Sequence, residues 1–101
     1  GNIVCSGVTM TTDIEIGSFN VFNLNVTVGH ETKINNFNVF NPSVNISGGV
    51  EIDSASLFGT GAQVLQFLRI TKGVTVGAGS VVTKDINESG VYVGIPARKV
   101  K

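Results

Sequence analysis

An apolar side chain stands at every sixth position of this chain from residue 4 to residue 82. The series runs without a gap through Val4, Met10, Ile16, Phe22, Val28, Ile34, Phe40, Ile46, Ile52, Phe58, Val64, Ile70, Val76 and Val82. Only 42% of all residues are hydrophobic, so an unbroken series of this length is not a chance event. A period of six fits neither an amphipathic helix, whose period is about 3.6, nor a simple alternating strand. It predicts short strands separated by tight turns.

A second series of small or β-branched residues lies four positions after the first. Its members are Val8, Val26, Thr32, Val44, Val50, Ser56, Ala62, Val74 and Ser80. The many Gly and Asn residues between the two series are typical of turns, and the β-branched residues are typical of strands. Asn20 and Asn38 interrupt the second series and lie three hexads apart. We expect them to stack in the interior as a hydrogen-bonded ladder.

Three hexads, each with one strand, make a triangular coil, and positions 18 apart do match in size. The columns are Phe22, Phe40 and Phe58; Ile16, Ile34, Ile52 and Ile70; and Val28, Ile46, Val64 and Val82. We predict an all-β fold, a single-stranded parallel β-helix of hexapeptide repeats shaped as a triangular prism, with coils about 4.8 Å apart. Residues 1–84 are expected to form the repeats, and residues 85–101 a C-terminal capping tail of the same domain. The crossover rule favours right-handed connections, so the repeat itself does not give the hand.

Charge and composition exclude several partners. The formal net charge is zero and the pI is about 6.8, which gives no electrostatic reason to bind nucleic acid or an anionic membrane. No stretch reaches 18 consecutive apolar residues, and the first ten residues lack the layout of a signal peptide. Cys5 is the only cysteine, which excludes an internal disulfide and favours a reducing compartment. We therefore expect a cytoplasmic protein.

Apolar residues also repeat at a spacing of 18 outside the interior positions. Phe19 aligns with Phe37, and Val21 aligns with Val39 and Leu57, so these residues should line outer stripes. Contiguous exposed apolar surface usually marks an interface, and a three-sided prism suits a closed three-fold ring. We predict a homotrimer; the alternative is that these side chains cover turns or the terminal tail.

His30 is the only histidine and lies outside both interior series, so its side chain should point outward. A solvated surface histidine is the simplest alternative. Three neighbours favour a catalytic role. Glu31 can orient the imidazole or raise its basicity, and Gly29 gives the backbone freedom at the turn. Gly48 lies one coil further on, so we expect an open notch beside His30 where a substrate approaches the backbone.

Several motifs resemble those of the hexapeptide-repeat acyltransferases. They are the hexad Gly77-Ala78-Gly79-Ser80-Val81-Val82 and the terminal Gly94-Ile95-Pro96-Ala97-Arg98. This likeness covers nearly the whole chain and implies a left-handed β-helix. A narrower set resembles the sialic acid and amino-sugar (bacillosamine-type) acetyltransferases of bacterial surface-glycan pathways. That set is Gly29-His30-Glu31, Ile46-Ser47-Gly48-Gly49-Val50 and Gly90-Val91-Tyr92-Val93-Gly94.

The resemblance implies acetyl transfer from acetyl-coenzyme A to an amino or hydroxyl group of a sugar or nucleotide sugar. His30 would be the general base in a direct attack, with Glu31 as the acidic residue that tunes it, and no metal would be needed. Backbone N–H groups near Gly48 would receive the developing oxyanion. The cofactor groove would lie between neighbouring prisms, and its residues would be Gly48, Gly59, Thr60, Gly61, Gly77, Ala78 and Gly79. Arg98 and Lys99 would either reach the coenzyme phosphates or remain solvated.

Two departures from the family pattern stand beside this prediction. Val39 occupies the position, nine places after the base, where amino-sugar members have a second histidine that contacts the cofactor. We also expect no counterpart, within these 101 residues, of the N-terminal domain that holds the sugar nucleotide in those members. A non-catalytic trimeric β-helix scaffold, or a truncated fragment of such an enzyme, therefore remains the alternative. A metal-dependent carbonic anhydrase needs three histidines, and an ice-binding face needs a regular threonine array; the sequence offers neither.

Overall fold

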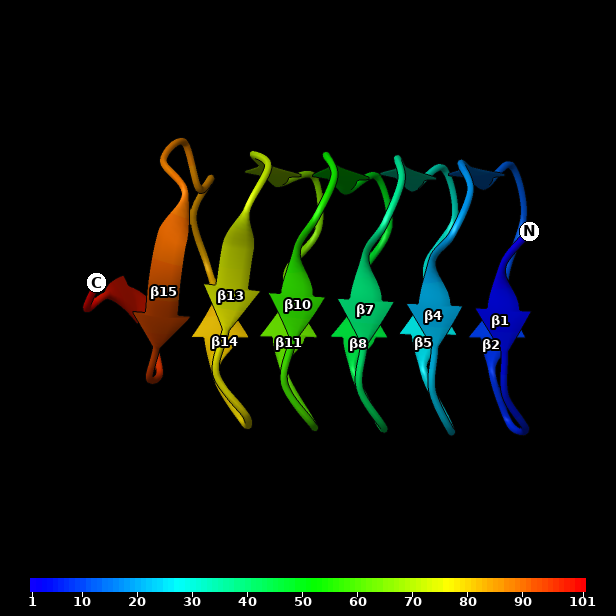
Figure 1. Cartoon of the computed structure of the whole chain (residues 1–101), viewed down its shortest axis with the longest axis horizontal. Coiled ribbons are helices and arrows are strands. Elements are labelled where there is room, and N and C mark those ends of the chain that lie inside the picture. The colour runs from blue at the N-terminus through cyan, green and yellow to red at the C-terminus, as the bar shows by residue number, and fades with distance from the viewer.

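The computed structural model describes every residue from Gly1 to Lys101 and contains no helix. Short strands form three sheets whose coils stack along one axis, as Figure 1 shows. Sheet A contains β1 (Ile3–Val4), β4 (Val21–Phe22), β7 (Val39–Phe40), β10 (Leu57–Phe58), β13 (Val74–Val76), β15 (Gly90–Val93) and β16 (Arg98–Lys99). Sheet B contains β2 (Thr9–Met10), β5 (Thr27–Val28), β8 (Asn45–Ile46), β11 (Gln63–Val64) and β14 (Val81–Val82). Sheet C contains β3 (Glu15–Ile16), β6 (Lys33–Ile34), β9 (Glu51–Ile52) and β12 (Arg69–Ile70).

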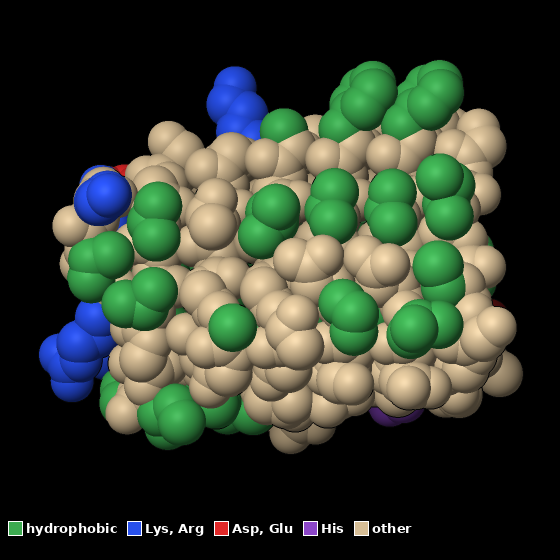
Figure 2. Space-filling view, turned by 60° about the horizontal axis from the view of Figure 1, so that its bottom comes forward, with side chains coloured by type: hydrophobic (Ala, Val, Ile, Leu, Met, Phe, Trp, Pro, Cys, Tyr) green, Lys and Arg blue, Asp and Glu red, His purple; other side chains and the backbone are tan.

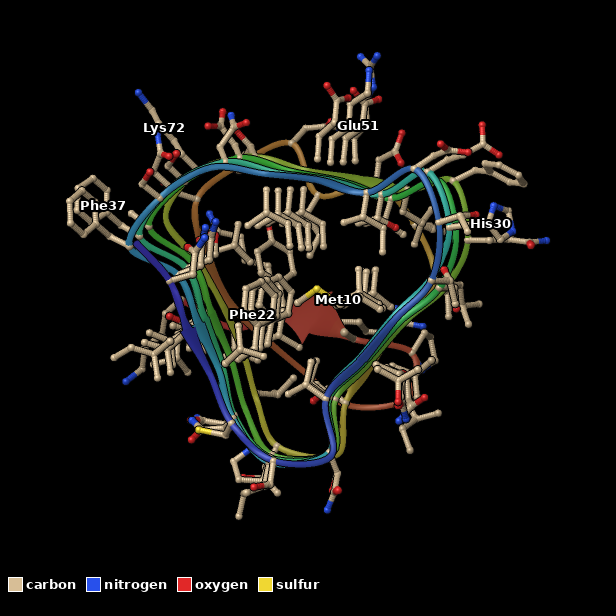
Figure 3. The ribbon with its side chains drawn as sticks, turned by 90° about the vertical axis from the view of Figure 1, so that its right-hand side faces the viewer. Met10, Phe22, His30, Phe37, Glu51 and Lys72 are labelled. Atoms are coloured by element: carbon tan, nitrogen blue, oxygen red, sulfur yellow. The ribbon has the colours of Figure 1, made fainter.

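Parallel pairing at a fixed offset of one coil joins the strands from β1 to β14, β15 pairs with β13 in the same sense, and only β16 pairs in the antiparallel sense. The whole molecule measures 31 × 21 × 20 Å. Figure 3 views the prism from its N-terminal end. The chain there passes from the side of Phe22 to His30, along the side marked by Glu51 and on to Phe37, counterclockwise as it recedes from the viewer. The solenoid is therefore left-handed, and the predicted all-β left-handed parallel β-helix is confirmed.

One backbone conformation recurs at every corner. The third residue after each interior strand residue has a φ between 57° and 73°. These residues are Gly7, Asp13, Phe19, Asn25, Glu31, Phe37, Ser43, Gly49, Ala55, Gly61, Phe67, Gly73 and Gly79. Most of them are not glycine, although the left-handed region costs an L-residue about 1–2 kcal/mol. The coil-to-coil hydrogen bonds, such as Phe37 N to Ser18 O at 3.1 Å, hold the corners in this conformation.

The interior contains the predicted columns. Phe22, Phe40 and Phe58 stack with ring centroids 4.8 and 5.0 Å apart and are fully buried. The Ile and Val columns on the other two sheets are also buried from the second coil onward, so most of the sixfold series forms one apolar cluster. The first coil is the exception, because no coil packs on its N-terminal side: Val4 is 55% exposed, and Met10 and Ile16 are only partly buried.

Asn20 and Asn38 are fully buried, as expected, but their amide groups bond to the backbone rather than to each other's side chains. The Oδ1 of Asn20 accepts from the backbone N–H of Asn38 at 2.9 Å, and the Oδ1 of Asn38 accepts from Ser56 N–H at 2.9 Å. The Nδ2 of Asn38 donates to the carbonyl of Asp53 at 2.8 Å. The ladder continues where Ser56 Oγ accepts from Val74 N–H at 3.0 Å. It therefore satisfies backbone groups at one corner of successive coils.

The solenoid continues beyond the last residue of the sixfold series. Ile86 forms an isolated bridge with Ile70 and is 5% exposed, so it extends the isoleucine column although it lies two positions earlier than the period predicts. β15 then pairs with β13 and places Tyr92 beside Val76 in sheet A. β16 folds back on β15. The segment 85–101 thus contains the last two strands of sheet A, the parallel strand β15 and the returning antiparallel strand β16. The chain has no helix with the length and apolarity needed to cross a membrane.

The outer surfaces of the three sheets differ in chemistry. Sheet C presents alternating charges, with Lys33 Nζ 3.7 Å from Glu15 Oε2 and Arg69 Nε 3.0 Å from Glu51 Oε2. Sheet B presents neutral polar groups in a ladder from Thr27 through Asn45 to Gln63. We refer to these surfaces as the charged face and the polar face.

Sheet A presents an apolar surface. Figure 2 shows a row of apolar side chains along the prism, with two aromatic side chains projecting at one edge. The row, which we call the apolar face, consists of Ile3, Val21, Val39, Leu57 and Val91. The projecting pair is Phe19 and Phe37, whose rings stack at 5.2 Å and are 63% and 60% exposed.

Candidate active site

His30 lies at the corner between sheets B and C, in the turn that joins β5 to β6. Its side chain points away from the interior, as predicted, and is 58% exposed (Figure 3). The Nδ1 atom lies 3.2 Å from Oε1 of Glu31. A carboxylate oxygen only accepts hydrogen bonds, so in the neutral imidazole this contact favours the tautomer with its proton on Nδ1 and its lone pair on Nε2. The geometry thus presents Nε2 as the proton acceptor.

The backbone of this turn accounts for the residue types at two positions, Glu31 and Gly29. Glu31 adopts the left-handed conformation, with a φ of 60°, and so directs its carboxylate toward the imidazole. Gly29 does not adopt that conformation, so the expectation that it supplies freedom at the turn is wrong. A Cβ at Gly29 would lie 2.5 Å from the backbone N of Gly48 and 2.7 Å from the carbonyl carbon of Ser47. Glycine is needed there because the next coil approaches too closely for a side chain.

The His30 ring lies over Gly48. A Cβ at Gly48 would lie 2.9 Å from Nε2 and 3.0 Å from Cε1 of the imidazole. The expected open notch is therefore occupied by the imidazole itself, because the ring leans toward the one neighbour that has no side chain. The two coils are tied together here by a 2.8 Å hydrogen bond from Gly49 N–H to the His30 carbonyl. The N–H of Gly48 makes no hydrogen bond within the chain. It is a free donor beside the catalytic candidate.

The residues that the family resemblance assigns to the cofactor lie mainly at another corner. Gly48 lies beside His30, but Thr60 and Ala78 stack at the corner between sheets A and B, in the turns after β10 and β13. Gly79 N–H donates to the Thr60 carbonyl at 2.8 Å. In one chain, sheet B separates this corner, which we call the cofactor corner, from His30.

The glycines of the cofactor corner have local reasons to be glycine. A Cβ at Gly59 would lie 2.6 Å from Ala78 N, and one at Gly77 would lie 2.6 Å from Cγ1 of Val93. Gly61 and Gly79 instead have φ values of 72° and 67°, with nothing within 4 Å of an added Cβ. The outer side of this corner is thus open backbone that a ligand can approach.

The remaining sequence candidates lie elsewhere. Val39 is on β7 in the apolar face, away from the corner of His30. Lys99 is on β16, and its Nζ lies 3.3 Å from Oε1 of Glu88. Arg98 is exposed beside it and forms no ion pair.

No hollow of the single chain contains His30. Of the three hollows on the surface, the largest lies over the charged face, the second beside it and the third at the C-terminal end. His30 therefore projects from a convex corner, where a substrate has no walls on either side within one chain. The structure contains no group of three His, Cys, Asp or Glu side chains placed to hold a metal ion.

Sequence reasoning missed two residues that complete this corner, Gln66 and Phe67. They lie one coil beyond Gly48 and Gly49, and the N–H of Phe67 donates to the carbonyl of Gly48 at 3.0 Å. The ring of Phe67 leans over Gly49, since a Cβ there would lie 2.6 Å from its Cε1. Both residues follow the Gly48–Gly49 pair by one full coil of three hexads. That spacing predicts that they lie next to the pair, and it was the signal that could have found them.

Fold and site together define a class: a left-handed β-solenoid of hexapeptide repeats that carries an outward His–Glu pair beside a glycine of the next coil. No family model matches the chain, and no curated protein matches it. Solved structures do. One is PerB from Caulobacter crescentus in complex with CoA and GDP-perosamine, at 20% identity and a TM-score of 0.76. Others are a maltose O-acetyltransferase from Clostridium difficile 630, at 24% and 0.85, and WeeI from Acinetobacter baumannii AYE, at 25% and 0.82.

These likenesses cover 99%, 99% and 96% of this chain, but only 57%, 65% and 57% of the three solved chains. The chain therefore spans less than two thirds of each of these proteins. The comparison confirms, for the fold, the resemblance to hexapeptide-repeat acyltransferases that the motifs indicated.

Proposed function

We propose that this chain is the β-helix part of an acetyl-coenzyme A-dependent acetyltransferase that acts on an amino or hydroxyl group of a sugar or nucleotide sugar. The observation that carries the proposal is the contact of the outward His30 with Glu31, beside Gly48, whose N–H has no hydrogen-bond partner within the chain. A base and an oxyanion donor that share one small patch are what direct attack on a thioester requires. The solved structures of similar fold that are named as acetyltransferases support the same reaction class.

The chemistry follows from the two nitrogen atoms of the imidazole. Nδ1–H donates to Glu31, which fixes the ring, and Nε2 takes a proton from the acceptor amine or hydroxyl as that group attacks the thioester carbonyl. The new bond joins the acceptor nitrogen or oxygen to the acetyl carbon, the carbon–sulfur bond breaks, and the proton on Nε2 passes to the sulfur, so that the coenzyme leaves as its thiol. The N–H of Gly48 would stabilise the oxyanion, a contribution of roughly 3 to 4 kcal/mol for such a donor. No covalent intermediate on the protein is needed.

The proposal includes a homotrimer, because a convex corner alone does not surround a substrate. The exposed stack of Phe19 on Phe37 marks the corner between sheets A and C, next to the apolar face. Placing that corner at a three-fold axis would bury the aromatic stack among three copies. His30 of one protomer and the cofactor corner of the next would then lie on either side of one groove. Such a groove supplies the walls that a single chain lacks.

The catalytic test measures acetyl transfer from acetyl-coenzyme A to a panel of aminosugars and nucleotide-linked aminosugars. The release of the free thiol of the coenzyme is the readout. Removal of a general base typically costs about 100- to 10,000-fold in rate, so His30→Ala should lose activity on that scale. Thr9→Ala, an exposed position on β2 in the polar face and away from the proposed three-fold axis, is the surface control and should keep the wild-type rate. If His30→Ala retains more than half of the activity, the assignment of the base is wrong.

The alternative of a non-catalytic scaffold has its own outcome. Isothermal titration of the wild type with millimolar acetyl-coenzyme A would then give no heat, and no acceptor would be acetylated. The assembly is tested by light scattering. The wild type should have the mass of three chains, and Phe37→Asp should have the mass of one chain while its circular dichroism is unchanged. A wild type with the mass of one chain would refute the trimer.

A further inference from the structure

The Gly48–Gly49 turn has side chains from two different coils leaning onto it. His30 covers Gly48 from the coil on the N-terminal side, and Phe67 covers Gly49 from the coil on the C-terminal side. Hydrogen bonds from Gly49 N–H to His30 O and from Phe67 N–H to Gly48 O fix the three corners in this order, at 2.8 and 3.0 Å. The imidazole of His30 and the aromatic ring of Phe67 thus lie over two neighbouring residues of one turn.

Phe67 gains little for the fold from its position. It is 69% exposed, and its φ of 60° is a conformation that glycine adopts freely and a bulky residue rarely adopts. The equivalent residues on the three preceding coils are Asp13, Glu31 and Gly49, which are polar or small. The other exposed phenylalanines, Phe19 and Phe37, shield each other by stacking, whereas Phe67 stacks on no aromatic ring.

We propose that Phe67 is a specificity-determining residue for the acceptor, and that its ring is the platform on which the sugar ring lies while its nucleophile faces His30. This inference rests on the proposed acetyl transfer. The C–H groups on one face of a pyranose carry partial positive charge and complement the negative face of an aromatic ring. Gln66, exposed beside it in the column of His30 and Gly48, offers an amide to the hydroxyl groups of the same sugar.

The position of Phe67 selects the acceptor over the coenzyme as its partner. Only groups next to the reacting atoms can touch a side chain that leans on Gly49, one residue from the proposed oxyanion donor. The coenzyme brings a thin pantetheine chain to that point, and its adenine ring lies at the far end of the molecule. The acceptor brings a ring. A flat aromatic surface therefore fits the acceptor sugar.

The test compares Phe67→Gly with Phe67→Tyr in the assembled wild-type background. Glycine removes the ring and relieves the left-handed backbone, so the melting temperature should not fall, while the KM for the sugar acceptor should rise about tenfold. Phe67→Tyr keeps the ring and should restore a KM close to that of the wild type. Ala55→Gly, which makes the same backbone change at another corner with a φ of 61°, should leave the KM for the acceptor unchanged.

The outcomes separate the two proposals. If the wild type transfers acetyl groups but Phe67→Gly keeps the acceptor KM of the wild type, the platform is refuted and the proposed function stands. The same holds if Phe67→Gly raises the KM for acetyl-coenzyme A instead of that for the sugar. If the wild type transfers acetyl groups to no sugar, the proposed function and the platform both fail.

Discussion

Asn38 offers the sharpest test of how this solenoid is held together. Its side chain is fully buried and serves two backbone groups on the next coil. The Nδ2 donates to the Asp53 carbonyl at 2.8 Å, and the Oδ1 accepts from the Ser56 N–H at 2.9 Å. Asn38→Ala leaves both groups without a partner. One buried unpaired group costs about 1–3 kcal/mol, so we expect the free energy of unfolding to fall by about 2–6 kcal/mol.

The column itself supplies a graded control. Ser56 occupies the same position one coil later, and its hydroxyl oxygen accepts from Val74 N–H at 3.0 Å. Asn38→Ser should therefore keep the bond to the Ser56 N–H and lose only the bond to the Asp53 carbonyl. Its cost should be about half that of the alanine variant, about 1–3 kcal/mol.

Urea unfolding followed by circular dichroism measures both variants. All proteins must be compared at one concentration, because an assembly makes the apparent stability depend on concentration. If the two variants are equally unstable, or if Asn38→Ala costs less than about 1 kcal/mol, the side-chain bonds of the ladder do not contribute as described.

Three further predictions concern residues of different kinds. Gly29→Ala should prevent folding or lower the melting temperature strongly, because its Cβ would lie 2.5 Å from a backbone atom. Gly61→Ala places its Cβ within 4 Å of no atom and should lower the free energy of unfolding by only about 1–2 kcal/mol. Equal effects of the two variants in thermal unfolding would contradict this. Phe40→Ala removes the middle ring of the stacked column and should cost about 3–5 kcal/mol in urea unfolding; a cost below about 1 kcal/mol would mean that the column collapses freely. Gly48→Ala should displace the His30 ring, since the new Cβ would lie 2.9 Å from Nε2, and lower kcat about 100-fold at unchanged stability; a wild-type kcat would show that the ring position is not critical.

Much of this fold follows from the sixfold apolar series alone. Phe22, Phe40 and Phe58 were predicted to stack because their spacing is one coil, and they do. The count failed at Ile86, which continues the isoleucine column two positions earlier than the period predicts. A strict period cannot detect a shortened coil, because every later residue is out of phase with the series.

The candidate site was predictable in part. The outward position of His30 and its pairing with Glu31 followed from the residues between the two interior series. The lean of the imidazole onto Gly48 did not, because the sequence shows that a side chain is missing but not which neighbour fills the space. Phe67 was missed because it belongs to no motif, and only the stacking of coils brings it beside the Gly48–Gly49 turn.

The shared conformation of the corners has a consequence for how such a chain can change. Because aspartate, asparagine, phenylalanine and glycine all adopt nearly the same φ at successive corners, an exchange at one corner alters what the surface displays but not the path of the chain. Each coil contacts only its neighbours, so the effect of such an exchange stays local. The side chains that face the proposed acceptor, coenzyme and neighbouring subunits could then be exchanged one at a time, with the prism as a constant frame.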